Sequence, residues 1–115
     1  MSGETRYERD FQHLRIGALR SHGDAGTDLR SHVEAHAAQL SGRPAEQPEI
    51  LPPPLGDFVK SIALHAYRIT DEDIAALKRA GYSEDAIFEI TVCAAVGAGS
   101  ARFERAMLAL REPPA

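Results

Sequence analysis

The chain has 115 residues, of which 43% are hydrophobic, 6% aromatic and 26% charged, and it contains a single Cys and no Trp. This length suits one domain with a real core and leaves no room for two. The formal net charge is −4, and the Lys and Arg residues are scattered among the acids, which argues against the clustered basic face that nucleic-acid binding needs. A single Cys excludes an intramolecular disulfide and a cysteine-rich zinc site.

The composition also predicts the fold class. A chain poor in aromatic residues and rich in Ala favours helices packed through small residues over a β-sandwich. The longest uncharged stretch near the C-terminus, residues 90–101, is too short to span a bilayer, and the first residues lack the apolar core of a signal peptide. We therefore expect an all-α, cytoplasmic protein with no membrane segment.

Residues 1–54 are predicted to form polar helices followed by a Pro-rich strap. Residues 7–19 and 27–40 each show apolar side chains at spacings of three and four, which is typical of a helix with one apolar face. Two glycines separate these segments, and Thr27 or Asp28 can cap the second helix. The apolar positions are Tyr7, Phe11, Leu14 and Ala18 in the first helix, and Leu29, Val33, Ala37 and Leu40 in the second.

His32 and His36 lie one turn apart on the second predicted helix, and His22 precedes them. Such a pair can bind a metal ion, but a site needs a third ligand and supporting hydrogen bonds. The order His-Val-Glu-Ala-His also differs from the HExxH motif, because Glu34 stands at the wrong position. Solvated surface histidines are the favoured interpretation, and we expect neither a metal nor a cofactor.

Residues 44–54 contain five prolines, three of them consecutive. Proline fixes φ and removes an amide donor, so this segment is predicted to be extended and non-helical. Ile50 and Leu51 within it indicate a strap that lies on an apolar surface.

Residues 55–112 are predicted to form the helical core of the same structural domain. Apolar positions recur over about three turns at Phe58, Val59, Ile62, Ala63 and Ala66. Thr70 can cap the next helix, whose first turn is acidic, and Gly81 can end it in a left-handed conformation. Ser83 then caps the last helix.

The last predicted helix, residues 84–111, is apolar on two opposite faces. Such a helix is either buried in its own domain or shared with another subunit. Because the rest of the chain is too small to surround it, we expect a homo-oligomer with this helix near the interface. The Gly97-Ala98-Gly99 segment allows either a close backbone approach or a local break. One face carries Ile87, Ile90, Ala94, Ala98 and Leu108, and the other carries Phe88, Val92, Val96, Phe103 and Leu110.

The segment from Ile74 to Ile90 contains a helix that ends in Ala-Gly and restarts as Ser-Glu-x-x-Ile. The Ala-rich helix that follows closes in Gly-x-x-Arg-x-x-x-Ala. Through these features, roughly residues 55–110 resemble the carboxymuconolactone decarboxylase/alkylhydroperoxidase-D-like family. The resemblance implies an alkylhydroperoxidase-D-like bundle of about five helices that assembles as an oligomer.

Redox members of that family carry Cys-x-x-Cys-x-x-x-His before the Ala-Gly turn. The resemblance aligns Ala66 and Ile69 with the two cysteines, and Asp73 with the histidine. Dithiol chemistry needs one activated thiolate and a second thiol that resolves the oxidised intermediate, so this mechanism is excluded. Decarboxylase members also lack the thiols, and an enzymatic function therefore stays open.

Cys93 and His65 are the residues most capable of chemistry. Cys93 could be a lone peroxidatic or nucleophilic thiol, but small buried core cysteines are common, and its apolar and acidic neighbours in sequence would raise its pKa. His65 could be a general acid or base tuned by a carboxylate such as Glu89, or it could cap the end of its helix. Arg102 and Arg105 could hold an anion, or could pair with Glu104 and Glu112 or with a neighbouring subunit.

Two functions follow from these residues. One is a non-redox family member that acts as an assembly protein or binds a small organic ligand. The alternative is an enzyme of decarboxylase or peroxidase type that uses His65 and Glu89, or Cys93. The enzyme hypothesis requires these three side chains to converge on one pocket.

Overall fold

The computed structural model describes residues 5–111, and every regular element in that range is helical. The prediction of an all-α fold with five helices is therefore confirmed. The elements are α1 (Arg6–Arg20), α2 (Thr27–Leu40), α3 (Leu55–His65), the 3₁₀ turn η1 (Ala66–Arg68), α4 (Asp71–Arg79) and α5 (Glu84–Arg111).

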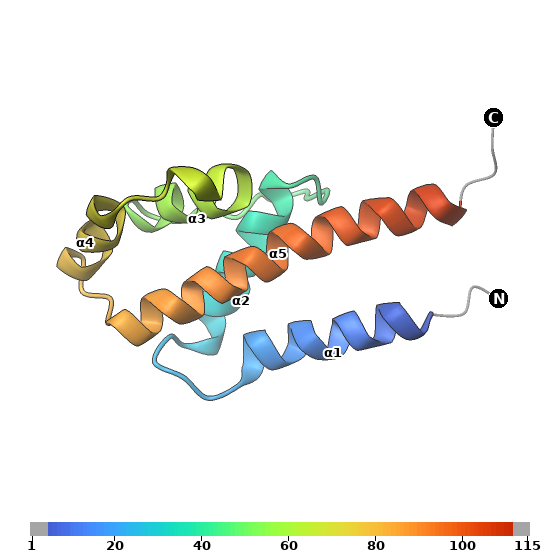
Figure 1. Ribbon diagram of the computed structural model, residues 1–115, viewed down its shortest axis with the longest axis horizontal. Helices are drawn as coiled ribbons and strands as arrows, with labels where there is room; N and C mark the ends of the chain where they lie inside the picture. Colours follow the sequence, from blue (N-terminus) through green and yellow to red (C-terminus); the bar gives the residue numbers. More distant parts are fainter. Residues whose placement is uncertain (1–4, 112–115) are drawn as a thin grey trace.

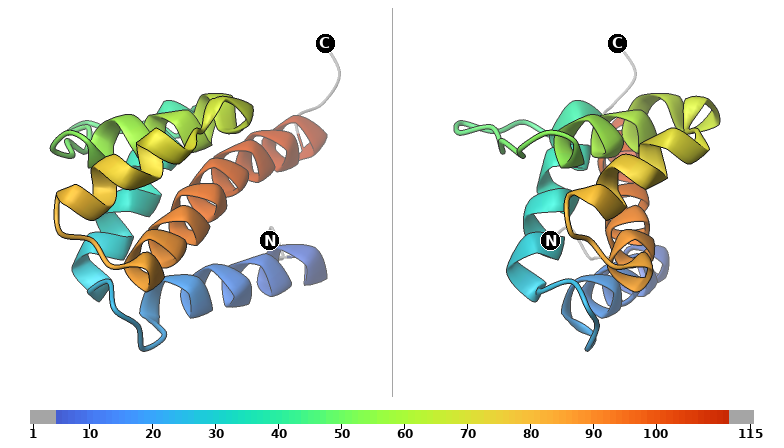
Figure 2. Two further views of the ribbon diagram at one scale, coloured as in Figure 1. Left: turned by 60° about the vertical axis from the view of Figure 1, so that its left-hand side comes forward. Right: turned by 90° about the vertical axis from the view of Figure 1, so that its left-hand side faces the viewer.

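Helix α5 runs through the whole fold, which measures 50 × 30 × 27 Å, and it contacts each of the other four helices. Its most extensive contact is with α2. In Figure 1, α2 crosses behind α5, while α3 and α4 lie above it and α1 lies below. The two views of Figure 2 show the same arrangement from other directions. Because α5 passes between all the others, its side chains decide most of the packing.

The hydrophobic core combines residues from both predicted segments of the chain. Val33 and Ala37 of α2 are fully buried, as the periodicity predicted, and Leu29 and Leu40 pack against the core. The part of the core from the second segment includes Leu55, Phe58, Val59, Leu77 and Ile90.

Gly97 allows α2 and α5 to approach each other closely. A Cβ atom at this position would lie 2.2 Å from the backbone oxygen of Glu34. Because α5 continues without a break through Gly97 and Gly99, the alternative of a local break is wrong, and close approach is the reason for this glycine.

Most predicted helix ends are confirmed. Thr70 and Asp73 form a capping box at the start of α4, and Ser83 Oγ accepts a hydrogen bond from the amide of Ala86 at 3.0 Å. Gly81 ends α4 with a φ of +103°. The predicted side-chain cap of α2 is wrong, because Gly26 precedes the helix and makes no side-chain hydrogen bond to its first turn.

Two predicted apolar stripes are only partly buried. In α1, Tyr7 and Leu14 are 72% and 62% exposed, because the helix turns Leu19 and the inner part of the Arg15 side chain toward the fold instead. Ala66 is exposed because α3 ends at His65 and the chain turns away through η1.

The Pro-rich strap and the end of α5 also depart from the expected burial. Leu51 packs against the core, but Ile50 is 87% exposed, so only one of the two predicted contacts forms. Leu108 is 48% exposed, although it shares a predicted face with Ile87, Ile90, Ala94 and Ala98, which are buried. In Figure 1 the C-terminal part of α5 extends past α2 and α3, which explains this exposure.

Helix α5 is long and apolar enough to cross a membrane by length and composition alone, with a mean hydropathy of 1.3 over 18 residues. Half of that window is buried inside the protein, as it is in a core helix, and one such helix carries no argument for a membrane.

Candidate functional site

Cys93 is completely buried between α5 and α1. Its thiol lies 3.5 Å from the backbone oxygen of Ala18, to which it donates a weak hydrogen bond. Burial raises the pKa of this thiol to about 11, and the nearby charge of Arg30 only partly offsets that increase. A neutral, inaccessible thiol is a poor nucleophile.

We expect Cys93 to resist alkylation in the folded protein. At pH 7.5, iodoacetamide should leave the native thiol unmodified over hours, whereas the same reagent in guanidinium chloride should modify it completely, as read by intact mass. Rapid modification of the native protein would contradict this expectation and would reopen a peroxidatic role.

Glu89 holds the loop between α1 and α2. Its carboxylate accepts hydrogen bonds from the backbone amides of Asp24 at 3.0 Å and Ala25 at 2.9 Å. A Cβ atom on Gly23 would lie 2.2 Å from the same carboxylate, so a larger residue there would have to displace the Glu89 side chain. Both carboxylate oxygens are thus engaged in fixing this loop.

His65 lies at the end of α3, where its ring makes an edge contact with Tyr67 at a centroid distance of 6.2 Å. Near it, Arg102 of α5 donates to the backbone oxygen of Ala63 at 2.7 Å. Glu89 stands thirteen residues before Arg102 on the same helix, a rise of roughly 20 Å.

The structure therefore does not bring the three predicted catalytic residues together. Glu89 and Cys93 lie one turn apart and face α1 and its following loop, whereas His65 lies toward the other part of α5. Their catalytic roles stay predictions that no contact of these side chains supports.

The predicted arginine pairs also differ from those observed. Glu104 accepts from Arg43, not from Arg102 or Arg105, because Arg102 is engaged with the end of α3. Glu112 lies outside the described residues.

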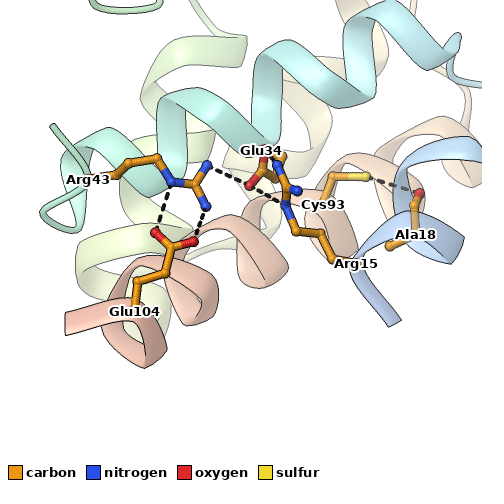
Figure 3. Close-up of polar contacts among 6 residues, drawn as sticks. All are labelled: Arg15, Ala18, Glu34, Arg43, Cys93 and Glu104. Atoms are coloured by element: carbon orange, nitrogen blue, oxygen red, sulfur yellow. Dashed lines mark hydrogen bonds and ion pairs between the residues drawn. The ribbon is translucent and has the colours of Figure 1, made fainter. Parts of the chain in front are cut away.

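Glu34 is the charged centre of the fold and is only 2% exposed. Arg15 of α1 binds its carboxylate through two nitrogens, at 3.0 and 3.1 Å, and Arg43 binds it at 2.8 Å. Arg43 also holds Glu104 of α5 at 3.2 and 3.0 Å, and Figure 3 shows these four side chains in a row across three helices. Burial alone would raise the pKa of Glu34, but the two arginines outweigh this effect and lower it.

His32 and His36 both turn toward Glu49 of the Pro-rich strap. The His32 ring lies 3.0 Å from the Glu49 carboxylate, and Nδ1 of His36 lies 2.9 Å from its backbone oxygen. Gln39 accepts the Glu49 amide at 2.7 Å. These contacts fasten the strap to α2, and residues 5–111 contain no group of three His, Cys, Asp or Glu side chains placed to hold a metal ion.

Among residues 5–111, two surface pockets are open to solvent. One, of about 290 Å³, lies between α2 and the strap, and the other, of about 360 Å³, lies between the α1–α2 loop and the turn before α5. Neither is lined by His65, Glu89 or Cys93.

One side of α5 is only partly covered in the part of the chain that the structure describes, because Phe11 of α1 stacks on Phe103 there, with ring centroids 4.9 Å apart. This outward face lies opposite α2, and it carries no charged residue between Phe88 and Leu110. Phe88 is 70% exposed and Leu110 is 78% exposed. In Figure 1, α1 lies along one side of α5, and α3 and α4 lie on the other. At 100° per residue, the outward face consists of Phe88, Val92, Ala95, Gly99, Phe103, Ala106 and Leu110.

Comparison with models of known protein families, with curated proteins and with solved structures finds no match.

Proposed function

We propose that the chain is a non-redox helical assembly protein, similar in plan to the carboxymuconolactone decarboxylase-like family, that self-associates through the outward face of α5. The observation that carries the proposal is the length of this face. It continues for six turns without a charge, while Cys93 is buried and the Glu89 carboxylate is bound to backbone amides.

The energetics support burial of this face. Covering a Phe or Leu side chain completely stabilises a protein by about 1.5–3 kcal/mol relative to leaving it exposed. A continuous apolar strip of this kind on a monomer marks an interaction surface. Ala95 and Ala106 on this face are small and exposed, which allows another helix to approach closely.

A second copy of the chain is the partner that this proposal names. Most oligomers of soluble proteins are built from identical subunits. A contact between two such copies buries this face on both of them. The sequence predicts the same arrangement, because this helix is apolar on two opposite faces and the rest of the chain is too small to surround it.

Replacing Ala95 with Glu should abolish self-association. The wild-type protein is expected to sediment as a dimer or larger species at about 100 µM, whereas Ala95→Glu should sediment as a monomer, because it places a charge in the middle of the apolar face. Ala95 is exposed in the single chain, so circular dichroism should show an unchanged helical content.

Ala80→Glu is the matched control, since Ala80 is an exposed alanine at the end of α4, away from the outward face. It should sediment like the wild type. A wild-type protein that stays monomeric throughout the concentration range, or an Ala95→Glu variant that still associates, would overturn the proposal.

A further inference from the structure

Glu49 of the Pro-rich strap is held by three side chains from successive turns of α2. His32 contacts its carboxylate at 3.0 Å, and His36 contacts its backbone oxygen at 2.9 Å. Gln39 accepts a hydrogen bond from its backbone amide at 2.7 Å. The steps between these residues are four and three, so the three side chains share one side of the helix. Glu49 is therefore the residue at which the strap is fastened to α2.

Both histidine rings have to donate a hydrogen bond from Nδ1 in this arrangement. The partners of the two Nδ1 atoms are an ionised carboxylate and a backbone carbonyl oxygen, which only accept. A neutral imidazole carries a hydrogen on Nδ1 in one of its two tautomers, whereas a protonated imidazole always carries it. Proton uptake by either ring therefore favours the fastened strap, and a protonated His32 also forms an ion pair with Glu49.

The surrounding charges leave the Glu49 carboxylate to the histidines. Arg43 lines the same pocket as Glu49, but its guanidinium is already bound to Glu34 and Glu104. Within residues 5–111, no ion pair joins Glu49 to α3, which follows the strap. The other charged or titratable residues of the strap and of the adjoining side of α2 are Asp28, His32, His36, Arg43 and Glu46.

From these contacts we infer that His32 and His36 form a clasp that holds the strap more tightly as the pH falls from 8 to 5. Histidine is the side chain that ordinarily changes its charge in this range. The strap forms one wall of the pocket of about 290 Å³, and α2 forms the other, so the clasp controls how firmly that wall is held. The inference is independent of the proposed self-association, because none of these residues belongs to α5.

Hydrogen exchange of the Glu49 amide, followed by NMR, measures how firmly the strap is held, since this amide donates to Gln39. Its protection factor is the exchange rate of an unstructured chain at the same pH divided by the measured rate, so the direct effect of pH on exchange cancels. We expect the protection factor to rise about two- to five-fold from pH 7.5 to pH 5.5, as for one partly exposed ion pair. A constant protection factor, or an amide that is unprotected at both pH values, would overturn the inference.

Variants identify the groups that carry the pH dependence. His32→Gln and, as a second variant, Glu49→Gln should each lose most of the rise, because each removes one charge of the ion pair. The double variant His32→Gln/His36→Gln should lose all of it, since glutamine can donate a hydrogen bond but takes up no proton. His13→Gln is the matched control, because His13 is an exposed histidine on α1, and it should keep the full rise. A double variant that keeps the full rise would show that another group is responsible and that the clasp is wrong.

Discussion

Gly97→Ala is expected to destabilise the fold by about 1–3 kcal/mol, the usual cost of overpacking a core. In most helix interiors the same replacement stabilises by about 1 kcal/mol, because Ala loses less conformational freedom than Gly. Here the added Cβ would lie 2.2 Å from the Glu34 backbone oxygen, which cannot rotate away as the end of a side chain can. Helices α2 and α5 would have to separate along their most extensive contact.

Urea denaturation followed by circular dichroism gives the free energy of unfolding for this comparison. Gly99→Ala, two residues further along α5, is the matched control and should be neutral or stabilising, since its Cβ makes only an ordinary contact. Both changes are best made in the Ala95→Glu background, so that subunit contacts do not enter the comparison. Equal effects at the two glycines would show that α2 and α5 do not approach as closely as described.

The sequence predicts those parts of the fold that depend on local patterns. Thr70, Gly81 and Ser83 mark helix ends through their own backbone and side-chain preferences, and all three act as expected. Val33 and Ala37 recur with the helical period and are buried. These features can be predicted without knowing which helix packs against them, because each depends on residues within one or two turns.

The contacts that join distant parts of the chain could not be predicted in this way. Glu89 is a plausible tuning carboxylate in the sequence, yet it holds the amides of Asp24 and Ala25, more than sixty residues away. Periodicity places an apolar side chain on a face but does not say whether a neighbour covers that face. Tyr7 and Leu14 are exposed for this reason, although their spacing is helical.

The sequence contains one indication that Glu34 is buried and paired. Glu34 follows Val33 and precedes Ala37 and Ala38 on the buried side of α2. Burying a charge there destabilises the fold unless the charge is paired. The partners, Arg15 and Arg43, come from α1 and from the segment after α2, and no local spacing connects them with Glu34. A charged residue on an apolar helix face therefore indicates a buried ion pair, but not the identity of its partners.

Glu34→Gln is expected to destabilise the protein by about 3 kcal/mol, near the lower end of the cost of removing one member of a buried ion pair. The variant keeps the shape of the side chain but leaves Arg15 without its carboxylate, while Arg43 retains only Glu104. Thermal or urea unfolding at pH 7 measures the loss. Glu104→Gln is the matched control and should cost less than about 1 kcal/mol, because the Glu104 side chain is 43% exposed.

The difference between wild type and Glu34→Gln should also depend on pH. The arginines lower the pKa of Glu34 below its ordinary value of 4.5, so the charged carboxylate stabilises the fold fully above that value. As the pH falls from 4.5 through the pKa of the folded state, Glu34 takes up a proton and this contribution is lost. Unfolding free energies of the two proteins should therefore converge at acid pH, because both side chains are then neutral. A difference that stays constant from pH 7 to pH 3 would mean that the amide disturbs packing, and that the charge of Glu34 does not hold α1, α2 and α5 together.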